Sequence, residues 1–432
     1  MIDIILKAIK NNSIEKYLIE EKVTKSAELF FVKKELDMRR MKNVAHYTVT
    51  VFRDFEENDI KYRGSSIVNI VPEMDEDMIE KAISEAYYAA QFVKNKYYEL
   101  IKGEKKEMKV MPSSFENYTL NEACNAFVEA LYKEDVRKES FINSAEFFVN
   151  KNVVRIINSE GIDVSYTRYN ANGEFVVQCI EPQDVELYQN FEYTDLDTEA
   201  LSRQAREALD TVCARANAKT APKKGEYTVI LSGKNLSQLF EYYAARTSVG
   251  YIYAGISDLK PGDNVQREDA SGEKVNVTLK STIPYSLEGI EMKDVEIVQE
   301  GIVKNIYGNA RISYYLGVEP TGMPDAVSVD NGTVTFEEMK KEPYLYVVNF
   351  SDFSVNPLTG FFGGEIRLGY LFDGENVTPV TGGSISGNFI NSPNPSNSII
   401  DTDMPIVIPE RYKPFNDILF FVAVSDIKLK IC

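Results

Sequence analysis

The chain has 432 residues, with 48 lysines and arginines against 66 aspartates and glutamates, four cysteines, no tryptophan and a single histidine. One imidazole cannot build a multi-histidine zinc site, and a Ser-His-Asp triad would need it as its general base. The net charge of −18, which is 48 minus 66, repels a phosphate backbone, so we expect no nucleic-acid partner.

The composition, 44% hydrophobic and 26% charged residues, is typical of a soluble globular protein of two or three domains. The N-terminus lacks the basic and apolar regions of a secretory signal, and no apolar run is long enough to span a membrane. The four cysteines lie far apart without a C-x-x-C pair, which argues against a disulfide framework. These features favour a cytoplasmic protein without a membrane partner.

The first half is predicted to alternate strands with helices. Residues 46–52 alternate β-branched and aromatic side chains, and a turn at 57–59 leads to a second strand that ends near Val71. Asp75 is placed to cap an amphipathic helix, and Thr119 to Glu122 form a capping box for another. This order predicts helices that cover a sheet.

Residues 144–180 are predicted to form a meander of short antiparallel strands. Turn signals occur at Asn150-Lys151-Asn152, at Ser159-Glu160-Gly161 and from Asn170 to Gly173. A long helix follows over residues 198–216, and the polar segment 219–225 then supplies a linker. We therefore expect an α+β protein with an N-terminal domain, 1–218, and a β-rich C-terminal domain, 219–432.

The second half begins with a strand at Tyr227–Leu231 and a helix over residues 235–246, and continues mostly as strands. Glycines are dense between Gly360 and Gly387, which is typical of bends, bulges and close approaches of another backbone. No phosphate-binding motif is present, because Gly382 to Gly387 lack the following lysine and the helix that such a loop requires.

No motif of this kind identifies a catalytic centre. His46 lies in a strand and is interpreted as a structural residue. The acidic runs at 54–59 and 73–80 are interpreted as a turn and a solvated helix start, and no EF-hand loop occurs.

The order of several short motifs nevertheless resembles a known family over nearly the whole chain. In the first half the matching segments are Asn158-Ser159-Glu160-Gly161 and Tyr166-Thr167-Arg168. In the second half they are Pro222 to Leu231, Ser257-Asp258-Leu259-Lys260-Pro261-Gly262-Asp263-Asn264-Val265, Leu287-Glu288-Gly289, Ile297 to Lys304, Pro320-Thr321-Gly322, Asn356-Pro357-Leu358-Thr359-Gly360-Phe361-Phe362, Gly369-Tyr370, Pro379-Val380 and Ile385-Ser386-Gly387-Asn388. Together they resemble the TldD/PmbA family, the TldD/TldE metallopeptidases also called modulators of DNA gyrase.

The resemblance implies a two-domain α+β fold and membership in a family of cytoplasmic peptidases that act on unfolded peptides. In the zinc-bearing branch, a helix after the strand equivalent to Tyr227–Leu231 carries His-Glu-x-x-x-His, and a cysteine near the C-terminus completes the site. Such a metal would polarise the scissile carbonyl and activate water, with the glutamate as general base.

This chain departs from that pattern at the ligand positions. Phe240 and Ala245 occupy the two histidine positions, and only Glu241, at the family's general-base position, remains. The segment from Asn391 to Met404, where the cysteine would fall, contains none, and Cys432 is too far along. The chain therefore resembles the zinc-less PmbA/TldE-like branch, for which we expect no bound metal and Phe240 and Ala245 in the core.

A subunit of that branch would act as a homodimer or pair with a zinc-bearing TldD-like subunit, and its substrate would be an unfolded peptide held in a cleft. We expect Phe361, Phe362, Gly363 and Gly364 to bind that peptide, because glycines let another backbone approach and add to a sheet edge. The alternative is that these glycines only shape a twisted sheet.

Two other interpretations stay open. The chain could be an active hydrolase with a carboxylate site at Glu241 or a site shared between subunits, or it could be a peptide-binding scaffold with no peptidase partner. A role toward DNA gyrase is suggested by the family's name, and the acidic charge gives it no support.

Overall fold

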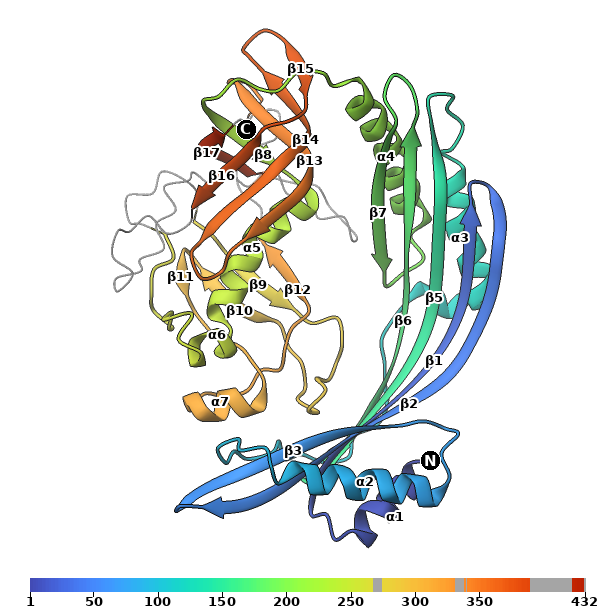
Figure 1. Ribbon diagram of the computed structural model, residues 1–432, viewed down its shortest axis with the longest axis vertical. Coiled ribbons are helices and arrows are strands. Elements are labelled where there is room, and N and C mark those ends of the chain that lie inside the picture. The colour runs from blue at the N-terminus through green and yellow to red at the C-terminus, as the bar shows by residue number, and fades with distance from the viewer. Residues whose placement is uncertain (267–273, 331–337, 339, 389–421, 431–432) are drawn as a thin grey trace.

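The computed structural model describes residues 1–266, 274–330, 338, 340–388 and 422–430 (Figure 1). Helices and strands are mixed along the chain, and most of the strand pairs are antiparallel. The predicted α+β class is therefore confirmed.

The N-terminal half is built on one long, curved sheet (Figure 1). Its strands follow the order β3-β2-β1-β5-β6, and β4 and β7 both pair with β6. The strands are β1 Lys16–Val32, β2 Glu35–Glu57, β3 Ile60–Ile70, β4 Lys109–Val110, β5 Ser140–Asn158, β6 Asp163–Cys179 and β7 Val185–Tyr193. The predicted turn after Glu57 is confirmed, and Asn58 and Asp59 there adopt positive φ angles.

Two of the turns predicted from the sequence are absent from this sheet, so these predictions are wrong. Residues 150–152 lie inside β5, and residues 170–173 lie inside β6. Asparagine favours turns because its side chain can bond to the nearby backbone. Here the amides bond across the strands instead, from Asn150 Nδ2 to Asn172 Oδ1 at 3.0 Å and from Asn152 Nδ2 to Asn170 Oδ1 at 3.1 Å. The predicted turn at 159–161 does separate β5 from β6.

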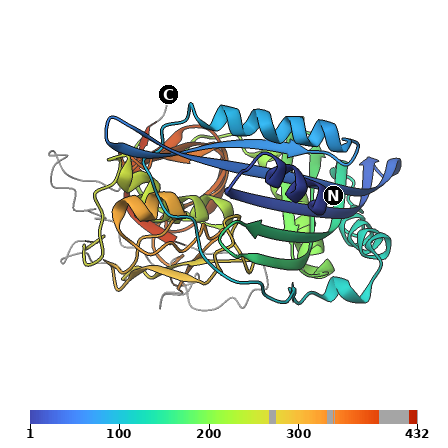
Figure 2. The same ribbon diagram turned by 90° about the horizontal axis from the view of Figure 1, so that it is seen from below.

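Four helices cover one face of the sheet. They are α1 Ile2–Asn11, α2 Glu76–Ala90, α3 Leu120–Tyr132 and α4 Thr198–Asn217, and a short 3₁₀ turn, η1 Ser114–Asn117, precedes α3. Asp75 caps α2 and Thr119 forms the predicted capping box with Glu122. Helices α1 and α2 lie side by side at one end of the sheet (Figure 2).

The side-chain alternation explains this layering. In β5, Phe147 and Val149 pack against α3 and α4, and Ile157, of the same parity, packs in the cluster under α1 and α2. Val154 and Ile156 point to the opposite face, where they meet Tyr285 of the C-terminal half. One face of the sheet is therefore covered by helices, and part of the other face contacts the second half of the chain.

The C-terminal half contains a small closed barrel and a second sheet. Strands β13, β8, β17, β16 and β14 form a ring, because β13 also pairs with β14, and β15 extends β14. Their bounds are β8 Glu226–Leu231, β13 Tyr344–Val355, β14 Phe361–Phe372, β15 Val377–Val380, β16 Ser384–Asn388 and β17 Val422–Lys430. The second sheet has the order β11-β10-β9-β12, with β9 Val277–Lys280, β10 Val295–Gln299, β11 Ile302–Val303 and β12 Ala326–Val329.

The helices whose bounds the structure describes in this half are α5 Gly233–Thr247, α6 Val249–Tyr253 and α7 Ala310–Leu316. The predicted division at residues 218 and 219 falls between the end of α4 and the start of β8, and it stays a prediction. Of the helices described, none is both long enough and apolar enough to cross a membrane.

Candidate functional site

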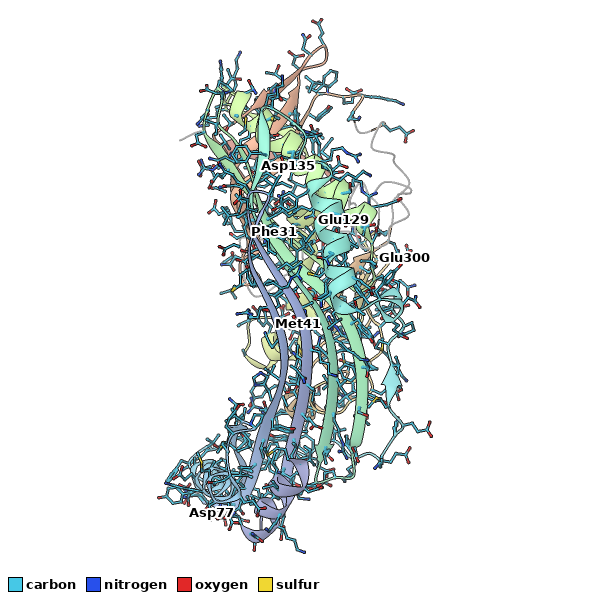
Figure 3. All side chains as sticks on the ribbon, turned by 90° about the vertical axis from the view of Figure 1, so that its right-hand side faces the viewer. Phe31, Met41, Asp77, Glu129, Asp135 and Glu300 are labelled. Atoms are coloured by element: carbon cyan, nitrogen blue, oxygen red, sulfur yellow. The ribbon has the colours of Figure 1, made fainter. Side chains whose placement is uncertain are left out.

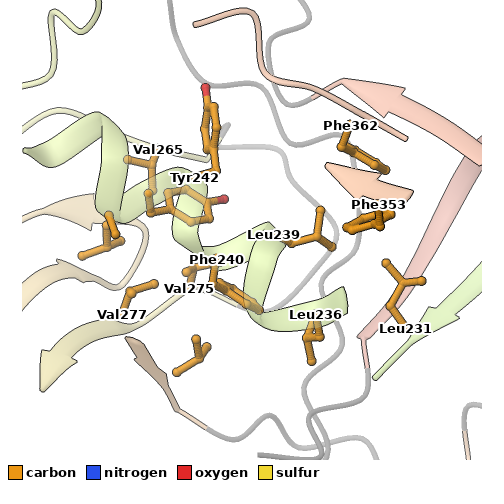
Figure 4. Packing of buried hydrophobic residues seen from close by; sticks show 14 of the residues in the cluster. Leu231, Leu236, Leu239, Phe240, Tyr242, Val265, Val275, Val277, Phe353 and Phe362 are labelled. Atoms are coloured by element: carbon orange, nitrogen blue, oxygen red, sulfur yellow. The ribbon is translucent and has the colours of Figure 1, made fainter. Parts of the chain in front are cut away.

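Helix α5 is the element on which the family resemblance places its chemistry. It follows β8 directly and lies between the barrel and the four-stranded sheet (Figure 4). Its inward side chains are buried with residues from both sheets, and these are Leu236, Leu239, Phe240, Tyr242, Tyr243 and Ala244. Burial raises the pKa of the Tyr242 hydroxyl to about 12, so it is neutral at physiological pH.

The two positions where the zinc branch carries histidine differ in environment. Phe240 is 3% exposed and belongs to the core cluster around Val275 and Val277, as expected. Ala245 is only half-buried and lies outside that cluster, so its placement in the core is wrong. Neither a phenyl ring nor a methyl group offers a lone pair, and these positions therefore do not fit a zinc ion.

Glu241 projects from the exposed side of α5. No hydrogen bond or ion pair joins it to the residues that the structure describes. A general base needs a metal-bound water or another reacting group within hydrogen-bond reach. In its present surroundings Glu241 is a solvated helix carboxylate.

The described ranges contain no replacement site, since no group of three or more His, Cys, Asp or Glu side chains there is placed to hold a metal ion. The segment from Asn391 to Met404 and Cys432 lie outside the described residues, so the predicted absence of a cysteine ligand there rests on sequence alone.

The Ser257-Asp258 motif has a structural role at the end of α5. Arg246 is buried, and its guanidinium donates to the Ile256 carbonyl at 2.6 Å and to Asp258 Oδ1 at 3.0 Å. Ser257 Oγ donates in turn to the Arg246 carbonyl. These bonds hold the following loop against the helix. They also pair the buried Arg246 charge, which would be costly to leave without a partner.

The four residues predicted to bind a peptide lie in the glycine-rich strand β14, which is paired on both sides from Phe362 to Gly364. Their role in peptide binding stays a prediction. Residues Phe361 to Gly364 pair with β16 on one side, and Phe362 to Gly364 pair with β13 on the other. A Cβ atom on Gly364 would lie 2.4 Å from the Asp352 carbonyl oxygen, and one on Gly363 would lie 2.9 Å from that of Ile385. The close backbones that these glycines admit are the neighbouring strands of the barrel.

The two phenylalanines of the same segment point in opposite directions. Phe362 is fully buried beneath Gly387, where a Cβ would lie 2.3 Å from its ring. Phe361 is 50% exposed. Of the four residues predicted to bind peptide, only Phe361 offers a large exposed side chain.

A polar surface that the sequence did not predict lies on the N-terminal sheet, on the face opposite α3 and α4. Asn150, Asn152, Asn170 and Asn172 form a hydrogen-bonded network there, and Thr24 Oγ1 donates to Asn152 Oδ1 at 2.8 Å. A hollow of about 540 Å³ beside it is lined by Phe148, Asn170, Asn172, Gly173, Glu174, Tyr188, Asn190, Phe191 and Glu192. The signal was present as asparagines two apart in two paired runs, which were interpreted as turns.

Two carboxylates lie opposite each other near this hollow. Glu146 and Glu174 face each other across β5 and β6, and burial together with the Glu174 charge raises the pKa of Glu146. Glu174 Oε2 also accepts a hydrogen bond from the Tyr188 hydroxyl at 2.8 Å. The surface is thus acidic at one end and rich in amides at the other.

Comparison with known proteins gives the fold and its relatives. Residues 224–399 match the family model described as the PmbA/TldA metallopeptidase C-terminal domain. A zinc metalloprotease TldD homolog of Saccharolobus solfataricus is 27% identical over 210 residues, which are 40% of this chain and 44% of that protein. The predicted resemblance to the TldD/PmbA family is therefore confirmed.

Solved structures of this family share the fold over nearly the whole chain. TldE from Thermococcus kodakarensis aligns with a TM-score of 0.74 at 16% identity, over 99% of this chain and 100% of that one. A candidate modulator of a DNA gyrase from Thermotoga maritima aligns with a TM-score of 0.74 at 17% identity, over 98% of each chain. At such identities the likeness establishes the fold alone.

The curated relatives are matched over only part of their length. The alignment covers 44% of the Saccharolobus solfataricus protein and 58% of an uncharacterized protein of Methanocaldococcus jannaschii, which is 24% identical over 272 residues. These matches therefore do not assign an activity, a substrate or a partner to this chain.

Proposed function

We propose that this chain is a non-catalytic, peptide-binding subunit of a TldD/PmbA-type metallopeptidase. It would act in the cytoplasm with a zinc-bearing TldD-like subunit and contribute to the binding of unfolded peptides. One observation supports this assignment above the others, and it is the composition of α5. Phe240 is packed in the core, Ala245 has no ligand atom, and Glu241 points to solvent without a polar partner in the described chain.

The amide-lined hollow is the surface on which we place the peptide. Asparagine side chains both donate and accept hydrogen bonds, as a peptide backbone does, so they suit an extended chain of varied sequence. Phe148 and Tyr188 add apolar surface, and Glu174 and Glu192 attract basic side chains. The paired edges of β14 leave no comparable place at Phe361 to Gly364.

The test is to titrate the purified chain into a zinc-bearing homologue from the same host and to measure cleavage of an unfolded peptide. We expect no cleavage by this chain alone, and cleavage by the homologue that rises until the two are equimolar. The double variant Asn170→Ala/Asn172→Ala is expected to raise the KM of the mixture without changing its kcat.

Asn217→Ala is the matched control, because within the described chain that exposed amide bonds only to the Cys213 carbonyl at the end of α4. Cleavage by this chain alone would contradict the non-catalytic assignment. An unchanged KM in the double variant, with the subunits still acting together, would contradict the peptide location only.

A further inference from the structure

The outer edge of β2 is open over residues 35–46. β1 pairs with this stretch on one side, but β3 pairs with β2 only from Tyr47 to Glu57. No other strand of the described chain lies beside it, and every side chain from Glu35 to Asn43 is exposed. Figure 3 views the molecule from this side, with Phe31 and Met41 labelled on the β1–β2 pair.

The opposite end of the sheet is protected in a way that this edge is not. At β7 the outward carbonyl of Asn190 accepts a bond from Gln204 at 3.0 Å, and that of Glu186 accepts one from Arg215 at 3.0 Å. Within the described residues, no side chain bonds to the backbone of residues 38–46. An open edge presents unpaired N–H and C=O groups that can pair with another extended chain.

The side chains along this edge are basic and apolar. Between residues 38 and 46 there are three fixed positive charges, Arg39, Arg40 and Lys42, and no acidic residue, in a chain of net charge −18. Met38 and Met41 are 41% and 67% exposed. Arg40 and Lys42 share one internal partner, Glu28, whereas Arg39 has no ion pair within the described chain.

These features disfavour a second copy of the chain as the occupant. A bulge lies at Asp37, because Phe30 pairs with Met38 and Phe31 with Leu36, and bulges interrupt regular pairing at an edge. A two-fold antiparallel pairing centred on any residue from Arg39 to Lys42 would place two basic side chains directly opposite each other. Like charges in that position are destabilising.

We propose that this edge binds an extended acidic segment of another polypeptide by strand addition. The backbone groups of residues 38–46 would supply the hydrogen bonds, and the charges would select the partner. An acidic side chain of the bound segment on one face of the strand would pair with Arg39. Acidic side chains on the other face would pair with Arg40 and Lys42, because these two cations share a single carboxylate, Glu28. The inference concerns a surface away from α5 and does not depend on the proposed function.

The test uses a short fluorescent peptide that alternates glutamate with threonine, and a lysine–threonine peptide of equal length as its counterpart. We expect the glutamate peptide to bind the full chain, more weakly at high salt, and to slow hydrogen exchange of backbone amides within residues 38–46. Arg39→Glu is expected to weaken binding by about ten-fold or more. That residue is exposed and has no internal ion pair, so the variant is expected to fold.

Lys81→Glu, on the outer side of α2, is the matched charge reversal away from this edge, and it should leave binding unchanged. The proposal is overturned if the glutamate peptide does not bind, if both peptides bind equally, or if Arg39→Glu binds as tightly as the native chain. It is also overturned if exchange slows elsewhere but not within residues 38–46, or if the native chain dimerises through this edge.

Discussion

The C-terminal barrel and the N-terminal sheet differ in how far their strand edges are paired. In the barrel, β14 is paired on both sides where its glycines lie, and α5 adds an apolar face with Phe240 in the core. In the N-terminal sheet, β2 has an open edge and one face carries an asparagine network beside a hollow. The barrel is therefore closed at β14 and packed with apolar side chains, whereas the asparagine network and the open strand edge both lie on the N-terminal sheet.

The largest expected effect breaks the packing of α5. Phe240→Ala should lower the free energy of unfolding by about 3–5 kcal/mol, because it removes a buried ring and leaves a cavity. Glu241→Ala, the adjacent exposed residue, should change it by less than about 0.5 kcal/mol. Chemical denaturation of both variants measures the difference, and an equal loss in the two would contradict the assignment of Phe240 to the core.

A second prediction concerns the closed strand β14. Gly364→Ala should destabilise the fold by about 1–3 kcal/mol, because the new methyl group would collide with the Asp352 carbonyl. Gly250→Ala, in α6, serves as the control, since its Cβ would have only an ordinary contact with Ser248 Oγ at 3.6 Å. Thermal unfolding compares the two, and a neutral Gly364→Ala would show that this glycine is not needed for strand pairing.

The asparagine network should contribute less. Asn170→Ala removes the acceptor for Asn152 and the donor to Asn172, and each bond contributes about 1 kcal/mol at most, because the surface is half-buried. We expect a loss of about 1 kcal/mol in denaturant unfolding, together with the change in KM described above. A loss as large as that of Phe240→Ala would indicate a structural network with little role in recognition.

The smallest expected effect on stability comes from ion pairs between the two halves of the chain. Glu291 of the C-terminal half pairs with Lys106 at 3.1 Å and with Lys109 at 2.5 Å, and these bonds lower the pKa of its carboxyl from 4.5 to about 2. A lowered pKa stabilises the folded state above pH 4.5, and this contribution is lost as the pH falls toward about 2. Both partners are well exposed, so the effect is modest.

Glu291→Gln should therefore flatten the dependence of stability on pH between about 4.5 and 2, and it should matter little at the bottom of that range. Unfolding curves at several pH values test this. If the stability of Glu291→Gln falls with decreasing pH in the same way as that of the native chain, the ion pairs of Glu291 do not stabilise the contact between the two halves.

Local features of the fold were predicted well from sequence. The capping box at Thr119, the cap at Asp75 and the helix after Tyr227–Leu231 are determined by neighbours in the chain, so residue patterns are enough to place them. Long-range pairing is different. The sequence predicted a strand at residues 46–52, but β2 extends from Glu35 to Glu57 because β1 pairs with it from Glu35 to Phe52 and β3 from Tyr47 to Glu57.

The candidate site follows the same division. The identity of Phe240 and Ala245 alone was enough to predict that the zinc-branch ligands are missing. Whether a glycine faces a peptide or a neighbouring strand depends on barrel closure, which brings β13 and β16 to the two sides of Gly364. The asparagine pairs were mistaken for turns for the same reason, since their partners are about twenty residues away in sequence.

The central claim is that α5 of this chain is structural and binds no catalytic metal. The most direct test is elemental analysis of the purified native chain after growth with zinc, combined with cleavage of an unfolded peptide in the presence and absence of a chelator. We predict zinc far below one ion per chain and no chelator-sensitive cleavage. One tightly bound zinc per chain, with cleavage that the chelator abolishes and Glu241→Ala removes, would contradict it.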